Sequence, residues 1–223
     1  MKLNVINLGR CGYEEALKVQ YDILEKRQQD EIDDTLILVE HPPVITMGRK
    51  AAQTNIVAPQ QYLKDNGIEL YETNRGGDVT YHGDGQIVGY PIFKLRGKGI
   101  GIREFVENLE NTFVNILKKE YDIDAGKNPD HTGVWVGDNK IVAIGLAVKR
   151  GVTMHGFAYN VNSNLDHFKL IVPCGISDKG VTSVEKITGE TIDFQAANKT
   201  VLEHFCEVFG YTDYECMELD DKR

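Results

Sequence analysis

The chain has 223 residues, which fits one domain or a tight pair of domains and suffices to bury a core without disulfides or metal. Hydrophobic residues make up 41% and charged residues 26% of the sequence, as is usual for a globular protein. The net charge of −9 argues against a general nucleic-acid binder, and no run reaches the ~18 apolar residues that a membrane span needs.

Apolar residues recur at helical spacing near the N-terminus, in the middle of the chain and near the C-terminus. The apolar stripe of the first stretch includes one polar residue, Gln20, which we expect at the edge of the stripe. Pro59 and Asn66-Gly67 are typical of the two ends of a short helix, and Gly210 is typical of a helix stop. The sequence therefore predicts helices over residues 13–29, 59–64, 102–117 and 194–209.

Short apolar runs between these helices predict strands. Two of the runs flank Gly137-Asp138-Asn139-Lys140, which indicates a tight hairpin. The predicted strands cover residues 36–41, 44–47, 68–73, 86–93, 134–136, 141–144 and 155–161. Because several strands are joined by hairpins, we expect an α/β fold of the α+β type, with a mixed or antiparallel sheet under helices.

The segment from Arg75 to Gln86 holds four glycines, an arginine and a histidine. Glycine lets the backbone approach a ligand closely, and Arg75 and His82 supply hydrogen-bond donors. A pair of turns between strands would also explain the glycines, but not Arg75 and His82. The segment lacks both the Gly-Lys-Ser/Thr ending of a P-loop and the glycine spacing of a dinucleotide-binding loop. We interpret it as a loop that wraps a small ligand.

The four cysteines form no Cys-x-x-Cys pair and have no histidine at zinc-finger spacing. The polar N-terminus does not resemble a signal peptide, so we expect a cytoplasmic protein with free, mostly buried thiols. Cys174 differs from the other three because Pro173 and Gly175 place it at a sharp break after an apolar run. Such a break can hold a thiol at the mouth of a pocket, and an inert buried cysteine is the alternative.

Lys140 is a candidate partner for this thiol. A free cysteine thiol has a pKa of about 8.5, so only a small fraction of the thiol is ionised at neutral pH. An ammonium group would stabilise the thiolate, whereas a neutral lysine would take its proton, and an ordinary solvated turn lysine is the third possibility. His41, His82 and His155 are alternative partners in a Cys–His pair. The histidine spacing does not favour a metal site.

The residues from Arg75 to Gln86 resemble the signature of the LipB family, the lipoyl(octanoyl) transferases. Further blocks that look like family blocks follow in family order, at residues 40–44, 132–136, 140–145, 155–158 and 171–176. The resemblance covers roughly residues 1–210. It implies the fold of the biotin/lipoate protein ligase catalytic domain, a mixed-sheet sandwich with packed helices, here as a single domain over residues 1–223.

The resemblance also implies a reaction. The enzyme takes an octanoyl group from acyl carrier protein, holds it as a thioester on Cys174, and passes it to a lysine of lipoyl domains in 2-oxoacid dehydrogenase E2 subunits and glycine cleavage H protein. Lys140 lowers the pKa of the thiol and shuttles protons. No cofactor, metal, nucleic acid or membrane is implied. The residues expected to line the substrate pocket are Arg75, Gly76, Gly77, Asp78, Val79, Thr80, Tyr81, His82, Ala143, Ile144, Gly145, Gly156, Phe157 and Ala158.

One position departs from the family pattern. Asp84 stands where the family usually has proline, which relaxes the φ restraint and adds a charge beside the loop. Charge raises a second question, because acyl carrier proteins and lipoyl domains are generally acidic and this chain is itself acidic. Association would need a local basic face. The candidate residues, which are otherwise scattered solvated charges, are Lys94, Arg96, Lys98 and Arg103 in one group and Lys149 and Arg150 in another.

Three other functions stay open at this stage. An ATP-dependent lipoate or biotin ligase shares the fold and a glycine-rich loop, but it activates the acid as an adenylate and does not need Cys174. A related octanoyltransferase would use a different donor, such as an octanoylated carrier domain. A catalytically inactive module would only hold acylated carrier protein.

Overall fold

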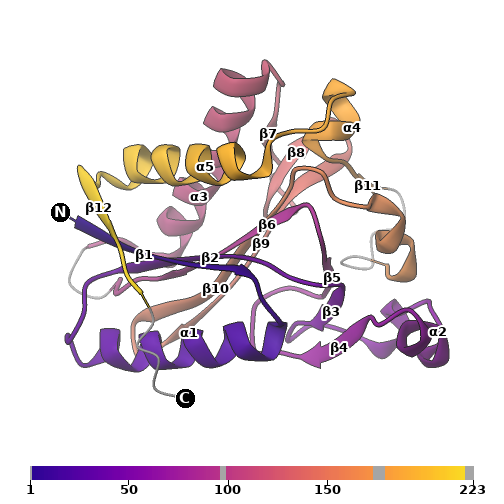
Figure 1. Ribbon diagram of the computed structural model, residues 1–223, viewed down its shortest axis with the longest axis horizontal. Coiled ribbons are helices and arrows are strands. Elements are labelled where there is room, and N and C mark those ends of the chain that lie inside the picture. The colour runs from indigo at the N-terminus through magenta and orange to yellow at the C-terminus, as the bar shows by residue number, and fades with distance from the viewer. Residues whose placement is uncertain (1, 96–98, 173–178, 219–223) are drawn as a thin grey trace.

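The computed structural model describes residues 2–95, 99–172 and 179–218 (Figure 1). Its helices are α1 (Tyr13–Gln28), α2 (Gln60–Asp65), α3 (Ile102–Tyr121), α4 (Val184–Thr188) and α5 (Phe194–Phe209), with 3-10 helices η1 (Gln53–Asn55) and η2 (Leu165–Leu170). Its strands are β1 (Lys2–Arg10), β2 (Thr35–Glu40), β3 (Val44–Met47), β4 (Glu69–Glu72), β5 (Val79–His82), β6 (Gln86–Ile92), β7 (Gly126–Lys127), β8 (Val134–Val136), β9 (Asn139–Lys149), β10 (Val152–Asn160), β11 (Gly180–Val181) and β12 (Asp213–Cys216).

The described strands form two sheets. The larger sheet has the order β12-β1-β2-β6-β10-β9-β8-β7, with β11 paired to β9, and the smaller has the order β4-β3-β5. In the larger sheet, β1 runs parallel to β2 and β12, whereas β6, β10, β9 and β8 follow one another antiparallel. The predicted mixed sheet with packed helices is therefore confirmed.

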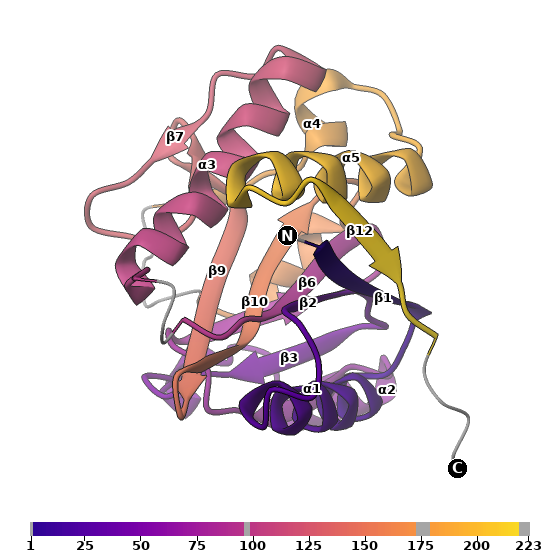
Figure 2. The same ribbon diagram turned by 90° about the vertical axis from the view of Figure 1, so that its left-hand side faces the viewer.

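Helices cover both faces of the larger sheet. Figures 1 and 2 show α3 and α5 on one face and α1 on the other, with the small sheet and α2 to one side of α1. The alternation of β2 explains how both faces are buried: Leu36 and Leu38 join the core under α3 and α5, and Ile37 and Val39 join the core under α1. This strand can therefore be apolar at four consecutive positions, 36–39.

The four predicted helices are confirmed. The last begins at a cap in which the Asp193 side chain accepts hydrogen bonds from two backbone N–H groups, and it ends at Gly210 with φ 74°. The expectation for Gln20 is wrong, because this side chain of α1 is completely buried. Its Oε1 accepts a hydrogen bond from the backbone N–H of His155 at 3.0 Å, so the polar residue has a partner inside the core.

The strand predictions are confirmed as elements, with three differences. The prediction omitted β1, β12 and the two-residue strands β7 and β11, and β12 is an exposed edge strand with no apolar pattern to reveal it. Residues 79–82, interpreted as loop, form β5 in the small sheet. Lys140 was expected in the hairpin turn, but β9 already begins at Asn139, so Lys140 lies within a strand.

The described cysteines follow the expectation only in part. Cys206 is buried, whereas Cys216 is exposed on the edge strand β12.

Within residues 2–95, 99–172 and 179–218, no helix combines the length and apolar character needed to cross a membrane.

We expect Gly89→Ala to destabilise the protein, because the Phe157 ring from the neighbouring strand occupies the space of the new methyl group. An added Cβ at Gly89 would lie 2.1 Å from Phe157 Cζ, and Phe157 is itself held by Phe113 at a ring distance of 4.8 Å. Overpacking of this kind costs about 1–3 kcal/mol in the free energy of unfolding, measurable by urea denaturation. Gly126→Ala is the matched control, since nothing lies within 4 Å of its added Cβ. Equal stability of the two variants would contradict the packing argument.

Candidate active site

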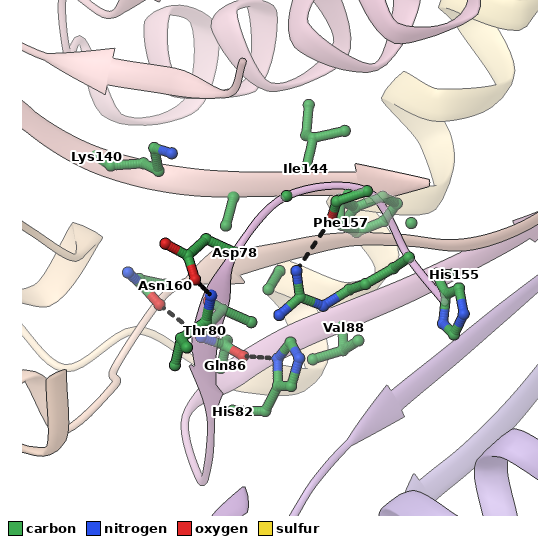
Figure 3. Close-up of a pocket in the computed structure, with 18 of the residues that line it drawn as sticks. Asp78, Thr80, His82, Gln86, Val88, Lys140, Ile144, His155, Phe157 and Asn160 are labelled. Atoms are coloured by element: carbon green, nitrogen blue, oxygen red, sulfur yellow. Dashed lines mark hydrogen bonds between the residues drawn. The ribbon is translucent and has the colours of Figure 1, made fainter. Parts of the chain in front are cut away.

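A cavity of about 800 Å³, counted with its open mouth, lies between strands β9 and β10 and the segment from Arg75 to His82 (Figure 3). Lys140 and thirteen of the fourteen predicted pocket residues line it, all except Tyr81. The structure thus brings three separated sequence blocks, at 75–82, 140–145 and 156–158, to one place.

The wall at residues 75–77 lies directly on its neighbours. The backbone N–H of Gly76 donates to Leu146 O at 2.8 Å, across the edge of β9. An added Cβ on Gly145 would lie 2.8 Å from Gly76 O, and one on Gly48 would lie 2.4 Å from Gly77 O. Glycine at 48 and 145 is therefore required for this close approach.

Arg75 is seated in this wall as a buried cation with only 8% of its surface exposed. Its Nη2 donates to Thr46 O at 2.6 Å, its Nε donates to Thr46 Oγ1 at 3.2 Å, and its Nη1 donates to Gly76 O at 3.1 Å. These contacts fix the guanidinium from the small sheet, so it forms a rigid part of the cavity wall.

The β5 strand points alternate side chains in opposite directions. Thr80 and His82 line the cavity, and Tyr81 faces the other way. The Tyr81 hydroxyl lies 2.6 Å from His167 Nδ1, and its ring packs against Phe168 at 5.4 Å between centroids. Tyr81 therefore supports η2 beneath the strand instead of lining the cavity.

A chain of hydrogen bonds fixes His82. Asn160 Nδ2 donates to Thr182 O at 3.0 Å, Gln86 Nε2 donates to Asn160 Oδ1 at 2.8 Å, and Gln86 Oε1 faces His82 Nδ1 at 2.8 Å (Figure 3). Because an amide oxygen only accepts, His82 carries its proton on Nδ1 and keeps the lone pair on Nε2. Burial lowers the pKa of His82 to about 3, so the ring is neutral.

The other two candidate histidines are also neutral. Burial lowers the pKa of His41 to about 4, and its ring bonds to Cys11 O and to the Tyr90 hydroxyl, each at 2.7 Å. Burial, with the charge of Arg75, lowers the pKa of His155 to about 3, and its Nε2 lies 2.7 Å from Asn74 Oδ1. Only His82 and His155 of the three line the cavity.

Lys140 reaches the cavity from β9, opposite Trp135 on β8. Its Nζ lies 4.8 Å from the centre of the Trp135 ring, a distance at which the ring face attracts a cation. In Figure 3, Lys140 and His155 stand on opposite sides of the cavity. Cys174, the predicted nucleophile, lies outside the described residues.

Several further residues line the cavity, and the sequence reasoning did not include them in the pocket. Period-two alternation from Gln86 along β6 would have found Val88 and Tyr90. Tyr13, Asn160 and Phe168 come from distant segments and carried no such signal. The additional lining residues are Tyr13, Gln86, Val88, Tyr90, His155, Asn160, Phe168 and Val181.

Asp84 ties the turn between β5 and β6 to β1. Its carboxylate accepts from Arg10 Nε at 2.6 Å and from Arg10 Nη2 at 3.3 Å. On the other side, the N–H of Gly85 donates to Glu40 Oε1 at 2.7 Å. An ion pair thus restrains the turn at the position where the family usually has proline.

The predicted basic faces are only partly described. Lys94 Nζ pairs with Asp30, and Lys149 Nζ lies 4.5 Å from the centre of the Tyr21 ring. Arg96 and Lys98 lie outside the described residues. Among the residues that the structure describes, no three His, Cys, Asp or Glu side chains are grouped so that they could hold a metal ion.

Comparison with known proteins agrees with this geometry. Residues 12–206 match the model of the lipoyl protein ligase A/B catalytic domain. The chain is 61% identical to an octanoyltransferase of Alkaliphilus metalliredigens over 98% of this chain and 100% of that protein. It is 51% identical to an octanoyltransferase of Desulforamulus reducens over 100% of this chain and 96% of that protein.

Solved structures share the fold at low sequence identity. A lipoate protein ligase from T. acidophilum with bound lipoic acid has a TM-score of 0.78 and 17% identity, over 100% of this chain and 91% of that one. A structure from the analysis of a bi-partite lipoate protein ligase and its E2 lipoyl domain from Thermoplasma acidophilum has a TM-score of 0.75 and 18% identity, over 98% of this chain and 87% of that one. Biotin protein ligase from Aquifex aeolicus has a TM-score of 0.56 and 15% identity, over 94% and 71%.

The fold is therefore that of the catalytic domain found in lipoate and biotin protein ligases. Within that class, the chain belongs to the lipoyl protein ligase A/B catalytic-domain family, in its LipB-type octanoyltransferase branch. It is an acyltransferase.

We expect the three buried histidines to make stability fall as the solution becomes acidic. Their folded pKa values are about 3 to 4, below the unfolded value of about 6.5. The unfolded chain therefore binds protons first, and stability is lost as the pH falls through about 6.5 toward the folded pKa. Each histidine should cost about 2 kcal/mol between about pH 6.5 and 5.

Urea denaturation across that range measures this slope. His155→Asn removes one titratable ring and should reduce the pH dependence of the free energy of unfolding by about one proton. Asn suits the position because it also tolerates the positive φ of 56°. An unchanged slope would contradict the neutral assignment of His155.

We expect the Arg10–Asp84 pair to replace a proline restraint. Arg10→Ala should lower the melting temperature slightly at low salt, and the difference should vanish at high salt because both groups are exposed. In an Asp84→Pro background, Arg10→Ala should have no effect at either salt concentration. A loss of stability that persists in the proline background would show that Arg10 acts through another contact.

Proposed function

We propose that this chain transfers an octanoyl group from octanoyl-acyl carrier protein to a specific lysine of lipoyl domains, through a thioester on Cys174. Residues 1–223 would act as one catalytic domain. The observation that carries the proposal is the cavity itself, in which the signature segment, the 156–158 block and Lys140 face the same space. The relatives at 61% and 51% identity are octanoyltransferases, which supports the acyl group chosen.

The cavity wall suits a thin apolar chain. Gly76, Gly77, Gly145 and Gly156 expose backbone to the cavity, and Val88, Ile144 and Phe157 are among its apolar walls. Burying about six methylenes at ~0.8 kcal/mol each gives about 5 kcal/mol as an upper figure. One methylene more or less should change the rate only about tenfold, so strict length selection would rest on the closed end of the cavity.

The proposed reaction has two acyl transfers. The Cys174 thiolate attacks the carbonyl carbon of the donor thioester, and the carbon–sulfur bond to the carrier breaks to release the carrier thiol. The amine of the acceptor lysine then attacks the Cys174 thioester, forming an amide and returning the thiolate. Lys140 would stabilise the thiolate or accept and return its proton, because the cavity histidines His82 and His155 are neutral and poor bases.

The acceptor follows from the family. The related archaeal ligase was analysed together with its E2 lipoyl domain, which supports lipoyl domains as acceptors here. We extend this to the E2 subunits of 2-oxoacid dehydrogenases and to glycine cleavage H protein. The carrier-protein donor rests on the family resemblance, as does a cytoplasmic location.

Ligase activity is the second candidate, because the solved structures of this fold include lipoate and biotin ligases. Those enzymes adenylate a free acid with ATP and need no thiol nucleophile. Consumption of ATP with free octanoate, surviving in Cys174→Ser, would favour a ligase over the transferase.

Intact-mass spectrometry tests the transferase directly. Incubation with octanoyl-carrier protein should add one octanoyl group, which peptide mapping should assign to Cys174, and Cys174→Ala should abolish the adduct. Lys140→Ala should slow both acylation and transfer by about 10²-fold or more while the protein stays folded. Lys64→Ala, a surface change on α2, is the matched control and should react normally. An adduct that persists in Cys174→Ala would overturn the proposed nucleophile.

A further inference from the structure

A second hollow adjoins the cavity, and the transfer reaction as described above does not use it. It is an open groove of about 1050 Å³ that lies beside η2, β11 and α4. Phe168 and Val181 line both the groove and the cavity, so the two spaces share a wall. In Figure 1 these three elements lie together at the right-hand side of the molecule.

The groove has an apolar floor and a basic rim. Leu165, Phe168, Ile171, Val172 and Val181 supply the apolar surface. Among the residues that the structure describes, the charged lining of the groove consists of three lysines and one carboxylate, namely Lys169, Lys179, Lys186 and Asp166. In a chain with a net charge of −9, this excess of positive charge is a local feature that needs explaining.

The three lysines are neutralised to different degrees. Lys169 pairs with Asp166 at 2.6 Å, and Lys179 pairs with Asp138 at 2.7 Å, in ion pairs whose carboxylates are largely exposed. Among the residues described, no carboxylate lies within ion-pair distance of the exposed Lys186. The hydrogen bond from Lys169, with smaller contributions from the charges of His167 and Lys186, holds the pKa of Asp166 below its usual value. The rim therefore keeps a net positive charge that can attract an anion.

The groove also leads toward Lys140. Lys179 Nζ lies 5.8 Å from the centre of the Trp135 ring, and Lys140 Nζ lies 4.8 Å from the same centre. The ammonium groups of a groove lysine and of the cavity lysine therefore both lie against the Trp135 indole. A long ligand that lies in the groove with an anionic group at the rim would direct its other end toward Lys140.

We propose that this groove binds the prosthetic arm of the acyl donor, with the phosphodiester of its phosphopantetheine group held by Lys186 and Lys169. The inference rests on the proposed function, in which the donor is an acyl carrier protein. The arm has a single anionic group at one end, an amide chain with geminal methyl groups in the middle, and the thioester at the other end. The protein offers matching surfaces: the basic rim for the anionic group, the apolar floor for the middle of the arm, and Lys140 near the thioester end.

Two donors that differ only in the phosphate test this assignment. For the wild-type chain, kcat/KM for acylation by octanoyl-4′-phosphopantetheine should exceed that by octanoyl-pantetheine about tenfold at low salt, as expected for a charge-assisted contact. In Lys169→Gln/Lys186→Gln the ratio of the two values should fall toward one. The matched control is Lys64→Gln/Lys199→Gln, which removes the same charge from α2 and α5 and should keep the ratio.

The outcomes separate this inference from the proposed function. If the wild-type chain accepts both donors equally, or if the groove variant keeps the full ratio, the groove does not bind the phosphate. Reaction with octanoyl-carrier protein but not with octanoyl-4′-phosphopantetheine would assign recognition to the carrier's protein surface, overturning the inference and leaving the proposed function intact. If the chain reacts with none of the three donors, both the inference and the proposed function are overturned.

Discussion

The close contact of the backbone at residues 75–77 with β9 and Gly48 is the constraint on which the cavity depends. Gly76 hydrogen-bonds to Leu146 O, and there is no room for a side chain at Gly145 or Gly48. This contact joins the small sheet to the large one and fixes Arg75 through Thr46. The cavity is the space left beside the contact, so its shape follows from backbone packing, which varies little, more than from side-chain rotamers.

The polar groups around the cavity are mostly neutral and mutually bonded. Burial keeps His82 and His155 uncharged, and the chain from Thr182 through Asn160 and Gln86 fixes the tautomer of His82. The neutrality of both histidines limits the charge among the described lining residues to Arg75, Asp78 and Lys140. It also leaves Lys140, among the described residues that line the cavity, as the basic side chain suited to exchange protons at neutral pH.

Local charge and net charge have opposite signs in this molecule. The chain is acidic as a whole, yet the described lining of the groove beside the cavity carries three lysines against one carboxylate. Electrostatic attraction acts over about 10 Å at ordinary salt, so a basic rim can bind an anionic group even on an acidic protein.

The sequence by itself determined four of the five described α-helices, most strands, the mixed sheet and the family, because apolar periodicity and glycine-rich motifs are local signals. It also singled out Lys140 and the 75–82, 143–145 and 156–158 blocks, although only the fold brought them to one cavity. Tertiary structure alone decided that Gln20 is buried against the His155 backbone, that Tyr81 faces η2, and that Tyr13 and Phe168 reach the cavity. Contacts between residues far apart in the chain leave no local pattern, since each depends on how two separately formed elements pack.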